Sequence, residues 1–174
     1  MSKKTEKIDA KELAKELLND KTHGAEKSGA KAMEKAFKFC EGYKTFLDEA
    51  KTEREAVTWA VKAAEAEGFE EFDPDKKYKA GDKVYYNNRG KAMCLAVIGK
   101  KGLKHGARIC AAHIDNPRID LKPIPLYESS ELALLKTHYY GGIKKYQWTA
   151  IPLTLHGKII RTDGKEITVN IGQK

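Results

Sequence analysis

Hydrophobic residues in the first 70 positions recur at the spacing of amphipathic helices. Leu13, Leu17 and Leu18 share one face of a first predicted helix, and lysine and glutamate pairs occupy the other. The pattern is interrupted at 20–24 and resumes at Ser28. The hydrophobic stripe of this second predicted helix consists of Ala32, Ala36, Phe39 and Tyr43.

A third helix is predicted to begin after Thr52, because Thr52-Glu53-Arg54-Glu55 has the sequence of a capping box. In such a box the threonine side chain accepts from the third helical amide, while the glutamate accepts from the amide of the cap. Gly68 is expected to end this helix. Its buried positions are predicted to be Val57, Trp59 or Ala60, Val61 and Ala64.

After Tyr78 the pattern changes to that of strands. Residues 83–87 predict a strand and residues 88–90 a turn. Two continuous apolar runs follow, at 92–98 and 107–112, separated by a polar, glycine-containing loop. Such runs are typical of strands buried on both faces, so the sequence predicts a sheet covered by helices.

Further extended segments follow toward the end of the sequence. Residues 119–127 are predicted to be extended, with Pro123 and Pro125 keeping them at a sheet edge or out of regular pairing. Residues 151–160 and 166–171 alternate as two strands around a turn at 162–164.

The composition is that of a globular protein: 174 residues, of which 41% are hydrophobic and 33% charged. No apolar run approaches the roughly 20 residues of a membrane span. The N-terminus leads into charged sequence without the apolar core of a signal peptide, so we expect a cytoplasmic protein without a membrane partner. Cys40, Cys94 and Cys110 lie in apolar surroundings and predict buried thiols in a reducing compartment.

Charge is unevenly distributed along the chain, whose formal net charge is +8. Residues 1–51 carry a net charge of +2, residues 53–75 of −6 and residues 76–174 of +12. The basic part could bind the phosphates of a nucleic acid, face an acidic substrate, or contact an acidic part of the same assembly. Its basic residues are mostly scattered and no nucleic-acid-binding module is recognisable, so we expect no nucleic-acid partner.

One segment carries candidate chemistry: His113, Asp115 and Asn116-Pro117 follow a predicted buried strand. Ligands gather at strand ends of helix-covered sheets. Neutral imidazole is a good zinc ligand, and a carboxylate on its other nitrogen fixes its tautomer. Positions two apart on an extended chain face the same side, so both side chains can enter one pocket. The spacing alone also fits a histidine merely hydrogen-bonded by a neighbouring aspartate.

The other histidines carry less information. His23 and His105 lie in glycine-containing segments and are expected to be exposed. For His138 and His156 the sequence leaves two alternatives: the side chain packs in the core, or it contacts a partner.

The segment from Ala111 to Pro123 contains His113-Ile114-Asp115-Asn116-Pro117 and resembles the H-x-D-x-P signature of the M18 metallo-aminopeptidases. Further likeness is found where that family enters its oligomerisation domain, and the residues there resemble the bacterial and archaeal aminopeptidase I branch. It lies in Tyr127-Glu128, Glu131–Leu134 and His138–Trp148, with Gly141-Gly142 and Trp148 as family features. The resemblance extends from about Ala10 to the last residue.

The resemblance implies an exopeptidase that removes N-terminal residues from peptides, with a preference in some members for acidic ones. It implies two divalent metals, most often zinc, with cobalt or manganese as alternatives, and a glutamate as general base. His113 would be a metal ligand and Asp115 the residue that orients and polarises it. It further implies a cytosolic or vacuolar enzyme whose dimers build a dodecamer.

The implied fold is α/β: N-terminal helices and part of a helix-covered mixed sheet, running into an inserted β-rich oligomerisation domain. Residues 1–130 would be an incomplete N-terminal part of the catalytic domain, and residues 131–174 the start of the inserted domain. The family's remaining ligands would lie beyond residue 174, so we expect the 174-residue chain alone to be inactive.

Three functional hypotheses remain open from the sequence. The first is the N-terminal part of a metallo-aminopeptidase, the second an inactive assembly module of the same fold, and the third a basic nucleic-acid-binding domain. Lys144 and Lys145 could contact an acidic substrate side chain, contact a neighbouring subunit, or be solvated.

Overall fold

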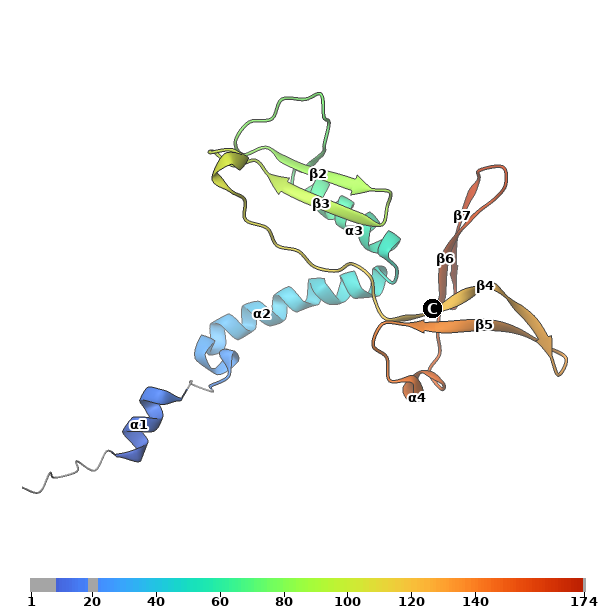
Figure 1. Cartoon of the computed structure of the whole chain (residues 1–174), viewed down its shortest axis with the longest axis horizontal. Helices are drawn as coiled ribbons and strands as arrows, with labels where there is room; N and C mark the ends of the chain where they lie inside the picture. Colours follow the sequence, from blue (N-terminus) through green and yellow to red (C-terminus); the bar gives the residue numbers. More distant parts are fainter. Residues whose placement is uncertain (1–8, 19–21, 174) are drawn as a thin grey trace, which may run out of the picture. The chain divides into compact units, whose positions relative to one another are not determined.

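The computed structural model describes residues 9–18 and 22–173, and these have an α/β architecture (Figure 1). The chain divides into two compact units, Met1–Lys44 and Thr45–Lys174. The predicted charged N-terminus and part of the predicted break at 20–24 lie outside the described residues. The elements in chain order are α1 (Ala10–Leu17), α2 (Gly24–Glu49), α3 (Glu53–Ala66), β1 (Glu70–Glu71), β2 (Lys83–Asn88), β3 (Ala92–Val97), the 3₁₀ helix η1 (Leu103–His105), β4 (Arg118–Ser129), β5 (Leu132–Tyr140), α4 (Lys145–Trp148), β6 (Leu155–Ile160) and β7 (Glu166–Ile171).

The first unit is helical, as predicted. Helix α1 begins at an N-cap aspartate, Asp9, whose carboxylate accepts a 2.9 Å hydrogen bond from the Lys11 amide. Helix α2 begins at Gly24, four residues before the expected start at Ser28. Gly29 interrupts it with a φ of +74°, a backbone conformation that only glycine adopts without strain.

In the second unit the capping box of α3 is confirmed. The Glu55 amide donates to Thr52 Oγ1 at 3.3 Å, and Glu55 Oε2 accepts from the amides of Thr52 at 2.9 Å and Lys51 at 3.0 Å. These bonds satisfy amides at the helix start that have no partner within the helix. Local sequence therefore determines where α3 begins.

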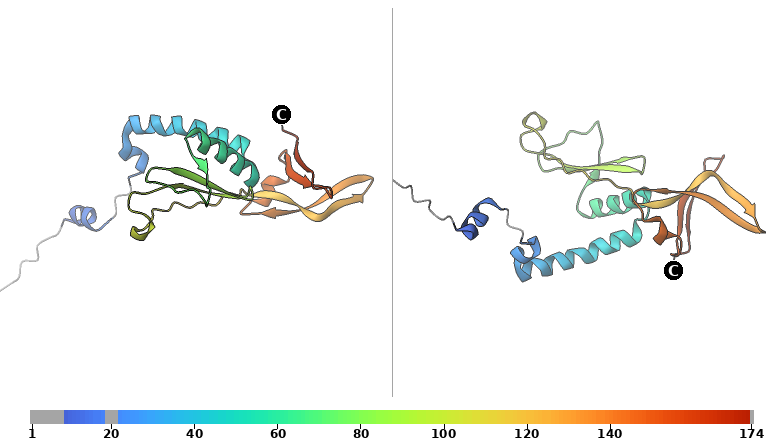
Figure 2. Two further views of the ribbon diagram at one scale, coloured as in Figure 1. Left: turned by 90° about the horizontal axis from the view of Figure 1, so that it is seen from above. Right: turned by 60° about the horizontal axis from the view of Figure 1, so that its bottom comes forward.

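Helix α3 packs on the sheet formed by β1, β2 and β3, which are arranged in that order (Figure 2). Strand β1 is parallel to β2, and β2 is antiparallel to β3. The three residues 89–91 connect β2 to β3, and Arg89 and Gly90 among them have positive φ. The buried hydrophobic residues of the described chain are Ala50, Ala56, Val57, Ala64, Val84 and Tyr85.

Three predictions about burial are wrong. Strand β3 matches the apolar run at 92–98, but it is mostly exposed and not buried on both faces. Residues 107–112 are exposed and form no strand, because no strand of the described chain lies beside them. Cys40, Cys94 and Cys110 are exposed, since the elements around them leave the apolar segments uncovered.

Strands β4 and β5 form a long antiparallel hairpin. Their register shifts between Leu121 and Leu126, the interval that contains Pro123 and Pro125. The expectation that these prolines disturb regular pairing is confirmed. Strand β5 was not predicted from the sequence. The turn that precedes it places Ser130 and Glu131, instead of glycine, at positive φ.

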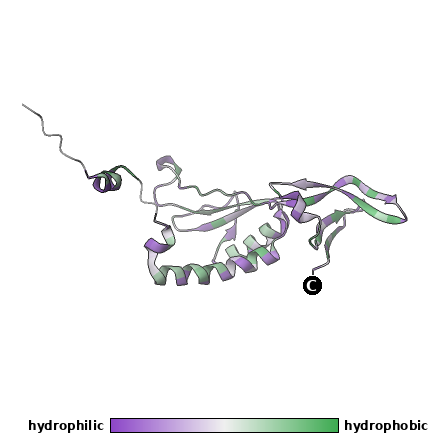
Figure 3. Ribbon diagram, turned by 90° about the horizontal axis from the view of Figure 1, so that it is seen from below, coloured by the Kyte–Doolittle hydropathy of each residue, from purple (hydrophilic) through white to green (hydrophobic). Residues whose placement is uncertain are grey.

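Strands β6 and β7 form the second predicted hairpin, and its turn at 162–164 is confirmed. Strand β6 begins at Leu155, four residues later than predicted. Hydrophobic residues along both hairpins are exposed, and Figure 3 shows them as green segments of the ribbon. No helix within residues 9–18 and 22–173 has the length and apolar character of a membrane-spanning helix.

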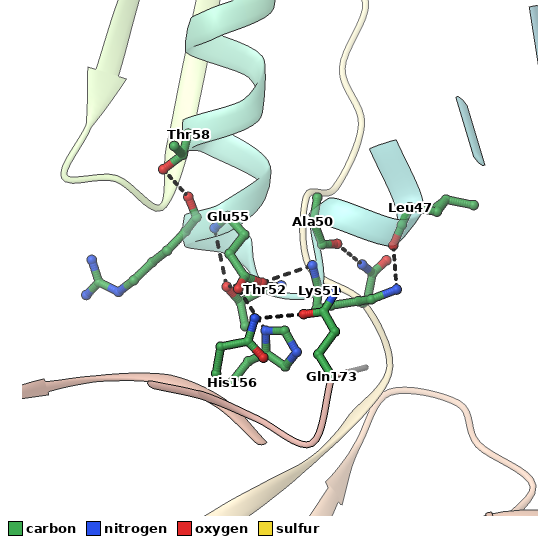
Figure 4. A network of polar contacts seen from close by, with 11 residues as sticks. Leu47, Ala50, Lys51, Thr52, Glu55, Thr58, His156 and Gln173 are labelled. Atoms are coloured by element: carbon green, nitrogen blue, oxygen red, sulfur yellow. Dashed lines mark hydrogen bonds and ion pairs between the residues drawn. The ribbon is translucent and has the colours of Figure 1, made fainter. Parts of the chain in front are cut away.

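His156 connects β6 to the start of α3 (Figure 4). Its side chain is only 6% exposed, and its Nδ1 lies 2.8 Å from Glu55 Oε1. Burial raises the pKa of Glu55, but hydrogen bonds from His156 and Thr52 and the charge of His156 outweigh it, so the net pKa lies below the ordinary 4.5. Of the two alternatives left open for His156, packing inside the chain is the one observed.

We expect Thr52→Ala to lower the free energy of unfolding by about 1 kcal/mol, because the first turn of α3 loses its side-chain cap. Thr58→Ala is the matched control: Thr58 is an exposed residue inside the same helix, where alanine is the better helix former. Urea unfolding followed by circular dichroism measures both. Equal midpoints for Thr52→Ala and wild type would contradict a stabilising cap.

We expect Glu55→Gln to remove a pH-dependent contribution to stability. Because the pKa of folded Glu55 is lowered, its contribution is present above about pH 4.5 and is lost as pH falls through the folded pKa. Glutamine can keep the capping box but not the charge. The stability difference between wild type and Glu55→Gln should therefore shrink on acidification.

Thermal unfolding from about pH 7 to about pH 3 measures this difference. Glu53→Gln, in the same helical turn, is the control, because it leaves the contact between Glu55 and His156 in place. A difference between wild type and Glu55→Gln that is constant with pH would show that the contact adds no charge-dependent stability.

Candidate metal-binding site

His113 lies in the extended segment that leads into β4, and its side chain is 81% exposed. Its Nδ1 lies 2.9 Å from the backbone oxygen of Asp115 and 3.6 Å from Asp115 Oδ1. A carbonyl oxygen only accepts hydrogen bonds, so Nδ1 carries the proton and Nε2 the lone pair. The side chain is therefore held in the tautomer that can ligate a metal through Nε2.

Asp115 is about one-third exposed and lies beside both His113 and the end of β5. The nearby hydroxyl of Tyr140 lowers the pKa of Asp115 below its ordinary 3.8. The Asp115 backbone amide and the nearby charge of Arg118 lower this pKa further, whereas desolvation acts in the opposite direction. Asp115 is thus a carboxylate that remains ionised beside the imidazole.

The two residues after Asp115 attach the site to the fold. Asn116 Nδ2 donates to the backbone oxygen of Ala50 at 3.4 Å, just before α3. Arg118, the first residue of β4, donates from Nε to Asp120 Oδ1 at 2.7 Å and from Nη1 to the Asn116 backbone oxygen at 3.3 Å. These contacts fix the chain immediately after Asp115.

The donor chemistry of His113 fits a zinc ion, but as one ligand of a set. A catalytic zinc is held by about three protein ligands. Within residues 9–18 and 22–173, no group of three or more His, Cys, Asp or Glu side chains could hold a metal. The described residues therefore bring together no complete set of zinc ligands.

A cleft of about 780 Å³ lies between the start of α3, the start of β4 and the segment that includes β6. His113 and Asp115 do not line it. Nε2 of His156 is buried at this cleft and has no hydrogen-bond partner in the described structure. Charged and polar residues of the lining include Arg54, Glu55, Asn116, Arg118, His156 and Lys158.

The remaining candidates are at the surface. His23, His105 and His138 are exposed, which confirms the expectation for the first two. Nζ of Lys145 lies 4.0 Å from the centre of the Tyr139 ring, and Lys144 precedes the short helix α4. The position of Tyr140 near Asp115 was not predicted from the sequence, because it depends on the pairing of β4 with β5.

Comparison with known proteins gives consistent matches. The family model described as Aminopeptidase I zinc metalloprotease (M18) matches residues 46–174. A protein of Clostridium acetobutylicum named probable M18 family aminopeptidase 1 is 44% identical over 165 residues, which cover 92% of this chain and 36% of that protein. A protein of the same name from Thermotoga neapolitana is 48% identical and is matched over 78% of this chain and 30% of its own.

Solved structures agree with these matches. The crystal structure of aminopeptidase I from Borrelia burgdorferi B31 superposes with a TM-score of 0.77 at 39% identity, over 83% of this chain and 36% of that one. For an M18 aminopeptidase from Thermotoga maritima the TM-score is 0.74 at 42% identity, over 79% of this chain and 30% of that one. The chain thus shares the α/β fold of these proteins and spans about a third of their length. It belongs to the M18 family, the aminopeptidase I zinc metalloproteases.

Proposed function

We propose that this chain is the N-terminal part of a metal-dependent aminopeptidase, which hydrolyses the N-terminal residue from peptides with a water activated by a binuclear metal centre. The observation that carries the proposal is the arrangement of His113 and Asp115. The imidazole of His113 is exposed, and its Nδ1 contacts the backbone oxygen of Asp115, so that Nε2 is available to a metal. The chain belongs to a zinc metalloprotease family.

His113 would be a metal ligand through Nε2. Asp115 would accept a hydrogen bond from Nδ1 of His113, which fixes the orientation of the ring and raises the basicity of the Nε2 lone pair. When bound, the metals, most often zinc with cobalt or manganese as alternatives, would polarise the scissile carbonyl and lower the pKa of a water molecule. The further ligands and the general base would be residues outside the range 1–174.

The same proposal covers domains, assembly and location. Residues 1–130 would belong to the catalytic domain and residues 131–174 to the inserted β-rich domain, with the boundary at the tip of the β4–β5 hairpin. The exposed hydrophobic residues of the hairpins fit burial between copies, a dimer and then a dodecamer. The site of action would be the cytoplasm.

An inactive assembly module of the same fold is the second candidate. It is favoured by the lack, within the described part of the chain, of any group of three metal-ligating side chains. The two candidates differ in whether further ligands meet His113 in the protein.

We expect His113→Ala to lower both bound metal and peptidase activity by at least about 100-fold, because it removes a ligand. The experiment compares the wild-type protein purified from its native source with the same gene product carrying the substitution. Intact mass identifies the polypeptides present, elemental analysis measures zinc, manganese and cobalt, and release of N-terminal residues from short peptides measures activity.

His105→Ala is the matched control, because His105 is an exposed histidine outside the segment of the site. It should keep both metal and activity. A single 19.5 kDa species without metal or peptidase activity would contradict the enzymatic proposal and favour the assembly module.

A further inference from the structure

The cleft of about 780 Å³ at the start of α3 contains a buried nitrogen that lacks a partner. The side chain of His156 is 6% exposed, and its Nδ1 lies 2.8 Å from Glu55 Oε1. Because the pKa of Glu55 is lowered, its carboxylate is ionised and Nδ1 donates this bond. In the neutral ring Nε2 then carries a lone pair, and nothing in the described part of the chain donates to it. A buried polar atom of this kind points to a donor from outside the described residues.

Most of the charged side chains that line the cleft already have a partner. The contacts are Arg118 with Asp120, Lys158 with Glu166, Glu55 with His156, and Lys51 with the backbone oxygen of Leu47. These contacts leave two lining side chains of opposite charge, Glu53 and Arg54.

Glu53 and Arg54 are the first two residues of α3, and both are half-buried. In the described part of the chain, neither side chain has a hydrogen bond or an ion pair. They act on Arg118 and Glu166 only through longer-range charge. A charge removed from water without a partner is unfavourable. One anion and one cation in the same cleft are therefore complementary to a molecule that carries both charges.

The lining also has an apolar part. It includes Trp148, Pro152 and Leu153, and Leu153 is 51% exposed. Apolar surface with a few polar groups is typical of sites for small molecules, and the volume of the cleft is within the usual range for them. The ligand should therefore carry an apolar side chain besides its two charges.

We propose that this cleft binds a small zwitterion with an apolar side chain, namely an amino acid or a short peptide with free ends. Its ammonium donates to Glu53 and to Nε2 of His156, and its carboxylate accepts from Arg54. Its side chain lies against Trp148 and Leu153. An ammonium has three N–H donors, so one group can satisfy both acceptors. Because Nε2 is buried, only a small group at the end of a ligand can reach it.

The test uses the 174-residue chain without metal. Isothermal titration calorimetry measures the affinities for L-leucine and for leucylglycylglycine, which carries the same two charges farther apart. Each ligand is also titrated as its C-terminal amide, which lacks the carboxylate, and as its N-acetyl form, which lacks the ammonium. The tighter of the two parent ligands identifies an amino acid or a peptide as the source of the zwitterion.

We expect loss of either ligand charge to weaken binding to the wild-type protein at least about tenfold, because a charged hydrogen bond is lost. Arg54→Gln should abolish most of the difference between the parent ligand and its amide. Glu53→Gln should abolish most of the difference between the parent ligand and its N-acetyl form. Lys62→Gln is the matched control, because Lys62 is an exposed cation of the same helix outside the cleft, and it should leave every affinity unchanged.

Nuclear magnetic resonance gives a second measurement, because bound ligand should move the ring ¹⁵N signals of His156 and leave those of exposed His105 in place. The inference is overturned if neither parent ligand binds at up to about 10 mM. It is equally overturned if the amide and N-acetyl forms bind as tightly as the parent, or if the His156 signals do not move. The modified ligands test each charge on the wild-type protein, so the result stands even where a variant fails to fold.

This inference does not rest on the proposed metal chemistry, because His113 and Asp115 do not line the cleft. Since binding is measured without metal, failure to bind would leave the proposed function of His113 untouched.

Discussion

Glu55 uses its two carboxylate oxygens for two different purposes, and the second unit depends on both. Oε2 accepts from the amides of Lys51 and Thr52 and so fixes the first turn of α3. Oε1 lies 2.8 Å from Nδ1 of His156, 101 residues later in the chain. The adjacent backbone oxygen of Ala50 also accepts from Asn116, next to Asp115. The start of α3 is therefore where the sheet, the candidate site and the β6–β7 hairpin are joined.

Features of the fold that depend on neighbouring residues were predictable from the sequence. The capping box, the turn at 88–90 and the effect of Pro123 and Pro125 each require only a few adjacent positions. Burial was less predictable, because it depends on what covers a segment. The run at 107–112 has the composition of a buried strand, yet it is exposed because no described strand pairs with it.

The candidate site shows the same contrast between features set by neighbouring residues and features that depend on distant parts of the chain. His113 and Asp115 were candidates because positions two apart on an extended chain face the same side, and in the structure Nδ1 of His113 lies 2.9 Å from the backbone oxygen of Asp115. The position of Tyr140 near Asp115 was not identifiable, because it depends on the register of two strands whose turn carries Ser130 and Glu131 in place of glycine. No local signal in the sequence specifies that register.

The hairpin has a role beyond joining two segments. A metal ligand is useful only if its ring is held in one orientation, and an exposed histidine in an irregular segment does not achieve this alone. In the structure, the close approach of Gly141 to Pro117 and the contact of Arg118 with the Tyr140 ring hold the start of β4 against the end of β5. If β5 belongs to the proposed inserted domain, these two contacts join that domain to the segment that follows Asp115.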